Sequence, residues 1–185
     1  MLLNHDTLKS LLNMLGVSVD LWGKGEYKGL DDLLEEIEQG ESFLKIDGNG
    51  IARTVEIVKL FVCDEDHPER GSLFELKQIL PDGRVRERMQ CPSEKIKSGE
   101  TPKAAAIRGV KEELHISFTG YRLFGTPLTI ENTVSKSYPN LPCSYVIHNF
   151  KVILNHGSPA LRERFTIAEG NGTTNFFGWE HPKRF

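Results

Sequence analysis

Two adjacent glutamates near the end of a predicted helix are the residues best suited to chemistry. Glu112 and Glu113 follow Gly109 by three and four positions, on the same helical face, and Glu100 comes from a Gly-Glu turn before the helix. Carboxylates placed in this way could hold a hard divalent cation such as Mg²⁺ against a substrate phosphate. Adjacent glutamates on an exposed helix are more often plain solvated surface, so the surroundings must decide.

The helix itself is clearly signalled. Thr101 is a suitable N-cap, Pro102 suits the first helical position, and three alanines follow. One apolar stripe then runs along the segment, formed by Ile107, Val110 and Leu114. These features predict a helix that begins after Thr101 and continues to about Leu114.

The segments around this helix alternate with a period of two. Such alternation predicts strands near residues 43–46, 54–63, 72–80, 84–89, 117–124, 128–132, 144–154 and 175–180. The tripeptide Pro81-Asp82-Gly83 predicts a hairpin turn, because proline presets φ and glycine accepts a positive φ. Strands, one helix and further strands predict a domain of the α/β (α+β) class.

Two amphipathic helices are expected before the strands. Leucines recur at helical spacing from Leu8 to Leu15 and from Leu30 to Ile37, and each run stops at a glycine. Trp22 and Tyr27 lie in the glycine-rich connection, where we favour packing over base stacking. We therefore expect a helical extension over residues 1–48, packed on a main domain of residues 49–185.

Composition narrows the classes of partner and compartment. The formal net charge is -3 and Lys and Arg form no long run, so we expect a nucleotide-like small molecule rather than extended nucleic acid. The amino-terminal segment lacks the apolar run of a signal peptide or membrane span. Three widely spaced cysteines fit no disulfide framework, so we expect a cytoplasmic protein that does not enter membranes.

Residues 94–116 resemble the Nudix box, whose pattern is G-x5-E-x7-R-E-U-x-E-E-x-G-U with U an aliphatic residue. The positions that agree are Glu100, Arg108, Val110, Glu112, Glu113 and Ile116. The resemblance implies a Nudix-type α/β/α sandwich with a mixed sheet, to which the two amino-terminal helices are added. It also implies Mg²⁺ or Mn²⁺ held by Glu112 and Glu113, with Arg108 and Glu100 bracing helix and loop.

Three positions depart from the pattern. Glu94 replaces the first glycine, His115 replaces the last glycine, and Gly109 replaces the glutamate after the arginine. We expect that the backbone at positions 94 and 115 no longer requires a positive φ. The resemblance implies that the glutamate missing at position 109 would be a metal ligand and, in some members, the general base.

Another acid could replace the missing glutamate. The candidates are Glu169, which is favoured, together with Glu94, Glu131 and Glu163, although each of these is also readily explained as a surface acid. Tyr138 lies in a proline-bounded turn, where it could stack on a substrate base or simply pack in the interior.

Three functions remain open from the sequence. The first is a hydrolase that cleaves a pyrophosphate bond in a nucleoside diphosphate linked to another moiety, with Mg²⁺ or Mn²⁺. The second, motivated by Gly109, is a catalytically impaired Nudix-derived module that binds or senses a nucleotide or metabolite. The third is a structural protein whose amino-terminal helices mediate assembly, and a homodimer is compatible with all three.

Overall fold

The computed structural model describes residues 3–157, 162–170 and 172–181. The chain forms two compact units, each assembled from separated segments. Unit 1 contains residues 1–57, 95–100 and 128–147, and unit 2 contains residues 58–94, 101–127 and 148–185. This division differs from the predicted boundary after residue 48, because the amino-terminal helices share a unit with later segments of the chain.

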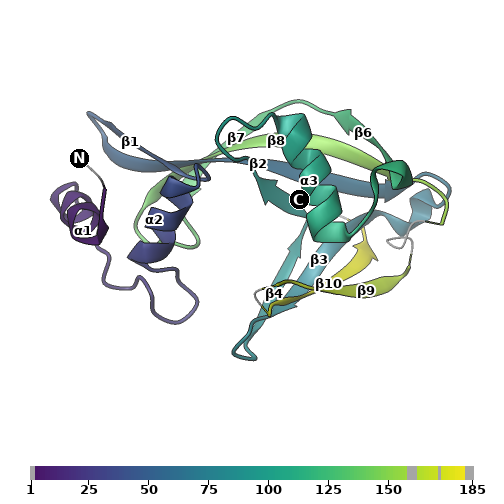
Figure 1. Ribbon diagram of the computed structural model, residues 1–185, viewed down its shortest axis with the longest axis horizontal. Coiled ribbons are helices and arrows are strands. Elements are labelled where there is room, and N and C mark those ends of the chain that lie inside the picture. The colour runs from purple at the N-terminus through teal and green to yellow at the C-terminus, as the bar shows by residue number, and fades with distance from the viewer. Residues whose placement is uncertain (1–2, 158–161, 171, 182–185) are drawn as a thin grey trace. The chain divides into compact units, whose positions relative to one another are not determined.

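The two predicted amino-terminal helices are present in unit 1 (Figure 1). Helix α1 spans His5–Met14 and begins where the Asn4 side chain accepts a hydrogen bond from the Thr7 backbone. Helix α2 spans Leu30–Glu38, and the Asp32 carboxylate accepts a 2.6 Å hydrogen bond from the Gly29 backbone. Their apolar faces meet residues from later segments in one core, which contains Leu8, Leu12, Val17, Trp22, Leu30, Leu33, Ile51, Tyr138 and Leu141.

The strands of unit 1 pair as antiparallel ladders. Strand β1, Phe43–Asp47, pairs with the start of β2, which spans Gly50–Asp64. Strand β7, Thr129–Val134, pairs with the start of β8, which spans Pro142–Leu154. Both long strands continue beyond unit 1, so the chain passes between the units within β2 and β8.

Glu36 of α2 is the buried centre of a charge network in unit 1. Arg53 Nη2 lies 2.6 Å from its Oε2, and Lys28 Nζ and Lys95 Nζ each lie 2.8 Å from its Oε1. Ser42 Oγ donates a further hydrogen bond of 2.8 Å to Oε2. Burial alone would raise the pKa of Glu36, but the three cations outweigh burial and hold that pKa well below its usual range.

Unit 2 contains a separate antiparallel sheet with strand order β4-β3-β10-β9 (Figure 1). Its strands are β3 (Ser72–Ile79), β4 (Val85–Gln90), β9 (Arg164–Ala168) and β10 (Thr174–Glu180). The predicted hairpin at Pro81-Asp82-Gly83 joins β3 to β4, and Gly83 has the positive φ of 82° that the turn requires. Strand β9 was not expected from the sequence.

The remaining elements lie wholly or largely in unit 2. Strand β5 (Ser93–Lys95) pairs with β2, and β6 (Tyr121–Gly125) pairs with the end of β8. Helix α3 spans Pro102–Leu114, and two 3-10 turns lie at Pro68–Arg70 and Phe118–Gly120. The predicted α+β class with two added amino-terminal helices is confirmed. None of the described helices combines the length and apolar character needed to span a membrane.

Candidate functional site

Helix α3 of unit 2 carries the acids that the sequence singled out. The Thr101 side chain accepts a hydrogen bond from the Ala104 backbone, and Pro102 occupies the first helical turn, as predicted. The helix buries one face, formed by Ala105, Ala106, Gly109, Val110 and Leu114. Its position is therefore fixed by packing as well as by its cap.

Glu113 lies in acidic surroundings. Burial raises its pKa most, and the negative charges of Glu94, Glu169 and Glu75 raise it further, while Arg88 opposes them. The result is a pKa of about 8, so this carboxyl stays largely protonated at neutral pH when no cation is bound. Two of the three neighbouring acids, Glu94 and Glu169, are the replacement candidates named from the sequence.

Glu75 is an acid of this site that sequence reasoning missed. It lies on β3 with 6% of its surface exposed, and its Oε2 is 2.9 Å from Arg88 Nε. Its Oε1 is buried without a hydrogen-bond partner among the described residues. Burial raises the pKa of Glu75, in part against the attraction of Arg88. The available signal was a charged residue directly after Leu73 and Phe74 in an apolar strand.

Glu94 fills the space beside Gly109. A Cβ atom at position 109 would lie 2.9 Å from the Cβ of Glu94 and 3.3 Å from Cδ1 of Leu60. The Glu94 carboxylate is ionically paired with Arg108, whose Nη1 lies 3.1 Å from Oε1. Two departures from the box pattern are therefore neighbours in space. Glu94, which stands where the pattern has glycine, lies against Gly109, which stands where the pattern has glutamate.

Glu169 is held by an amide network at the end of β9. Its Oε1 accepts a 2.6 Å hydrogen bond from Asn175 Nδ2, and Asn175 Oδ1 accepts one of 3.0 Å from Gln78. Asn175 is itself buried, with 1% of its surface exposed. This arrangement fixes the direction of a carboxylate that acts on Glu113.

Glu112 has different surroundings from Glu113. Its side chain is 55% exposed, and its Oε2 lies 3.4 Å from Arg108 Nη1. Arg108 thus pairs with both Glu94 and Glu112. Among the described residues no group of three His, Cys, Asp or Glu side chains is gathered as a bound metal ion would require.

Glu100 braces its own loop. The Oε2 atom accepts a 3.1 Å hydrogen bond from the Lys97 backbone N–H, across a turn that contains Gly99 with φ of 76°. Glu100 belongs to unit 1, whereas Glu112 and Glu113 belong to unit 2. The remaining candidates, Glu131 and Glu163, are exposed and do not appear among the charges that act on Glu113.

The backbone at the two substituted glycine positions behaves differently. Glu94 lies in strand β5 without a positive φ, as expected. His115, however, caps α3 in the left-handed region with φ of 53°, so the expectation for this position was wrong. The helix still ends in the conformation that favours glycine, and the histidine adopts it at a cost in strain.

Tyr138 is a core residue and does not line a cleft. Its side chain is fully buried, and its ring centroid lies 5.0 Å from that of Trp22. Arg53 lies over the same ring, with its Cζ 5.2 Å from the centroid. The suggestion that Tyr138 stacks on a substrate base is therefore wrong, because its faces are already covered by Trp22 and Arg53. Packing in the interior was the correct alternative for Tyr138 and for Trp22.

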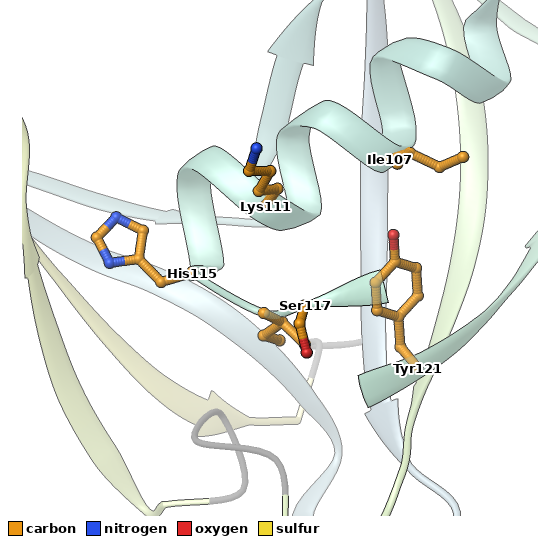
Figure 2. A pocket seen from close by; sticks show the side chains of 6 residues that line it. Ile107, Lys111, His115, Ser117 and Tyr121 are labelled. Atoms are coloured by element: carbon orange, nitrogen blue, oxygen red, sulfur yellow. The ribbon is translucent and has the colours of Figure 1, made fainter. Parts of the chain in front are cut away.

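A pocket of about 610 Å³ lies beside the carboxyl-terminal half of α3. Figure 2 shows Lys111 and His115 projecting from this helix and Tyr121 rising from β6. Ile107, Ile116 and Ser117 complete the lining. At about 100° per helical residue, Ile107 and Lys111 lie on the opposite side of α3 from Gly109 and Glu113. This pocket is therefore separate from the acids.

Comparison with solved structures finds a Nudix hydrolase from M. smegmatis, RenU. It has a TM-score of 0.32 and 16% sequence identity, over 60% of this chain and 79% of that chain. No protein-family model and no curated protein matches the sequence.

Proposed function

We propose that this protein is a Nudix-type hydrolase that uses Mg²⁺ or Mn²⁺ to cleave a pyrophosphate bond in a nucleoside diphosphate linked to another moiety. The proposed site lies in unit 2, around Glu113 of α3. Its support is twofold: the resemblance of residues 94–116 to the Nudix box, and the concentration of acids around this one side chain.

The observation that carries the proposal is an excess of negative charge in a partly buried place. Three further acids, Glu75, Glu94 and Glu169, act on Glu113, and Arg88 opposes them. The Oε1 atom of Glu75 is buried without a hydrogen-bond partner within the described part of the chain. A buried carboxylate oxygen left unpaired is costly, and a bound cation would remove that cost.

The donor chemistry of the site suits a hard cation. All four side chains offer carboxylate oxygens, which Mg²⁺ and Mn²⁺ prefer, and none offers sulfur or imidazole. Glu75, Glu94 and Glu169 act on Glu113, but the described side chains do not yet share one cation-sized space, so we expect them to turn toward a cation when it binds. A bound cation would neutralise phosphate charge and lower the pKa of water at the site.

The chain's own polar residues have positioning roles in this proposal. Arg108 holds Glu94 and Arg88 holds Glu75, which limits where each carboxylate can move. Asn175 orients the carboxylate of Glu169, the acid we assign to accept a proton from the attacking water. A general base held in place in this way typically contributes a factor of about 10² to 10⁴ in rate.

Hydrolysis tests the proposal directly. Purified protein is incubated with nucleotide sugars, dinucleotides and ADP-ribose in the presence of Mg²⁺ or Mn²⁺, and products are resolved by chromatography. We expect Glu113→Gln to lower turnover by at least about a hundredfold, as loss of a metal-site acid should. Glu87→Gln, an exposed acid on β4, is the matched control and should turn over like the parent. If no compound is cleaved by the parent, the protein is not this hydrolase.

A binding module without catalysis is the second candidate. Two observations favour it: Gly109 supplies no side chain, and no three acids are gathered in the described residues as a metal site. Isothermal calorimetry with the same compounds separates the two functions. Saturable uptake of a nucleotide without product, and without dependence on Mg²⁺, would support the module and exclude the hydrolase.

A further inference from the structure

The backbone conformation at Gly109 does not require glycine. It lies inside α3 and is not among the residues with a positive φ. Glycine is less favourable than alanine in a helix interior, because it has more freedom to lose. The reason for Gly109 must therefore lie in what approaches the helix at this point.

The approaching group is the side chain of Glu94. Its Cβ would be 2.9 Å and its Cγ 3.5 Å from a Cβ atom placed at position 109. The first distance is too short for two carbon atoms, and Leu60 Cδ1 at 3.3 Å closes the neighbouring space. Only a residue without a side chain at position 109 lets the Glu94 side chain pack this closely against the helix.

From its place beside Gly109, Glu94 pairs with Arg108 and acts electrostatically on Glu113. Its side chain is only 15% exposed, and Arg108 Nη1 lies 3.1 Å from Oε1. Among the acids that act on Glu113, Glu94 has the largest influence. The glutamate is thus held in place by the helix backbone on one side and by a guanidinium on the other.

A second observation supports a cation as the ligand of these acids. Glu75 acts on the same Glu113, is 6% exposed, and has an Oε1 without a hydrogen-bond partner in the described chain. Arg88 satisfies only its other oxygen. The acidic cluster therefore contains one buried carboxylate oxygen, Oε1 of Glu75, without a hydrogen-bond partner among the described residues.

We infer that Glu94 supplies the cation-binding acid that α3 lacks at position 109, and that Gly109 is the space through which it does so. The inference rests on the proposed function, because it assigns a ligand to the same metal site. The two residue types are exchanged relative to the box pattern, which has glycine at position 94 and glutamate at position 109. The acid thus lies on strand β5 instead of on helix α3.

Binding of Mn²⁺ alone tests the inference without a substrate. Isothermal calorimetry and the electron paramagnetic resonance signal of free Mn²⁺ report the affinity of the full chain for this ion. We expect Glu94→Gln to weaken binding at least tenfold, as does Glu113→Gln, while the exposed control Glu87→Gln binds like the parent. Parent-like affinity in Glu94→Gln, with affinity lost in Glu113→Gln, would overturn the inference and leave the proposed function standing.

The exchange variant gives the sharper test. In the double variant Glu94→Gly/Gly109→Glu, the acid returns to the helix and the space opposite it is emptied. We expect Mn²⁺ affinity within about fivefold of the parent, with helix content unchanged by circular dichroism. A folded double variant that binds no better than Glu94→Gln would refute the exchange. If the parent itself fails to bind Mn²⁺, the proposed metal-dependent function fails, and this inference fails with it.

Discussion

Replacing Gly109 by alanine adds one methyl group at the point where Glu94 crosses α3. In an open helix the change would stabilise the protein by about 1 kcal/mol, because alanine loses less conformational freedom than glycine. Here the new Cβ would meet Glu94 Cβ at 2.9 Å and Leu60 Cδ1 at 3.3 Å. A Cβ is attached to the backbone, so Glu94 can move away only if strand β5 shifts.

The two effects can be compared in magnitude. Overpacking a tight site costs roughly 1–3 kcal/mol, which exceeds the gain in helix propensity. We therefore expect Gly109→Ala to lower the free energy of unfolding by about 1 kcal/mol. In a Glu94→Gly background only Leu60 Cδ1, the end of a flexible side chain, stays close at 3.3 Å, and the same alanine should raise the free energy of unfolding by about 1 kcal/mol. The coupling between positions 94 and 109 should then be about 2 kcal/mol.

A double-mutant cycle measures this coupling. The parent, both single variants and the Glu94→Gly/Gly109→Ala double variant are unfolded with urea and followed by circular dichroism at 222 nm. The cost of Glu94→Gly on its own strand cancels in the cycle. If alanine at position 109 stabilises the protein equally in both backgrounds, Glu94 does not occupy this space and the account of Gly109 is wrong.

Three further predictions follow from the described contacts. Glu36→Gln removes the carboxylate that pairs with Arg53, whose side chain is only 3% exposed. We expect this change to lower the free energy of unfolding in urea by about 3–5 kcal/mol. The control Glu38→Gln, at an exposed position of the same helix, should change it by less than about 0.5 kcal/mol. The pKa of Glu113 is raised from 4.5 to about 8 in the folded protein. The contribution of its protonated form to the free energy of unfolding is therefore fully present below pH 4.5 and is lost as pH rises toward 8. In thermal melts without metal, Glu113→Gln should therefore be more stable than the parent at pH 9 but not at pH 4, and equal pH profiles would contradict this. His115→Gly removes a left-handed histidine at φ of 53° and should raise the free energy of unfolding by roughly 0.5–1 kcal/mol, a gain that thermal melts with His115→Ala as the comparison would detect.

Local signals in the sequence were sufficient for most of the fold. The cap at Thr101 and the turn at Pro81-Asp82-Gly83 act over a few neighbouring residues, so helix α3 and the hairpin were predicted close to their observed bounds. Strand β9 was missed because Arg164–Ala168 is short, and its strand form depends on pairing with β10. Division of the chain into units also depends on contacts between distant segments.

The candidate site was predicted only in part, for a similar reason. Position 109 could be identified as a departure from the box pattern, but not the residue that fills the space beside it, because Glu94 approaches from another element. Glu75 was missed because its burial depends on the sheet around it. Tyr138 was open to two interpretations because a proline-bounded turn gives no information on which way a ring will face.

The composition of unit 1 has a consequence for how the protein is made. Helices α1 and α2 leave the ribosome well before Tyr138 and Leu141, which belong to the same core. Until the segment that ends at residue 147 has emerged, these two helices have no complete core to join. Their leucine-rich faces therefore stay uncovered by native partners during much of translation.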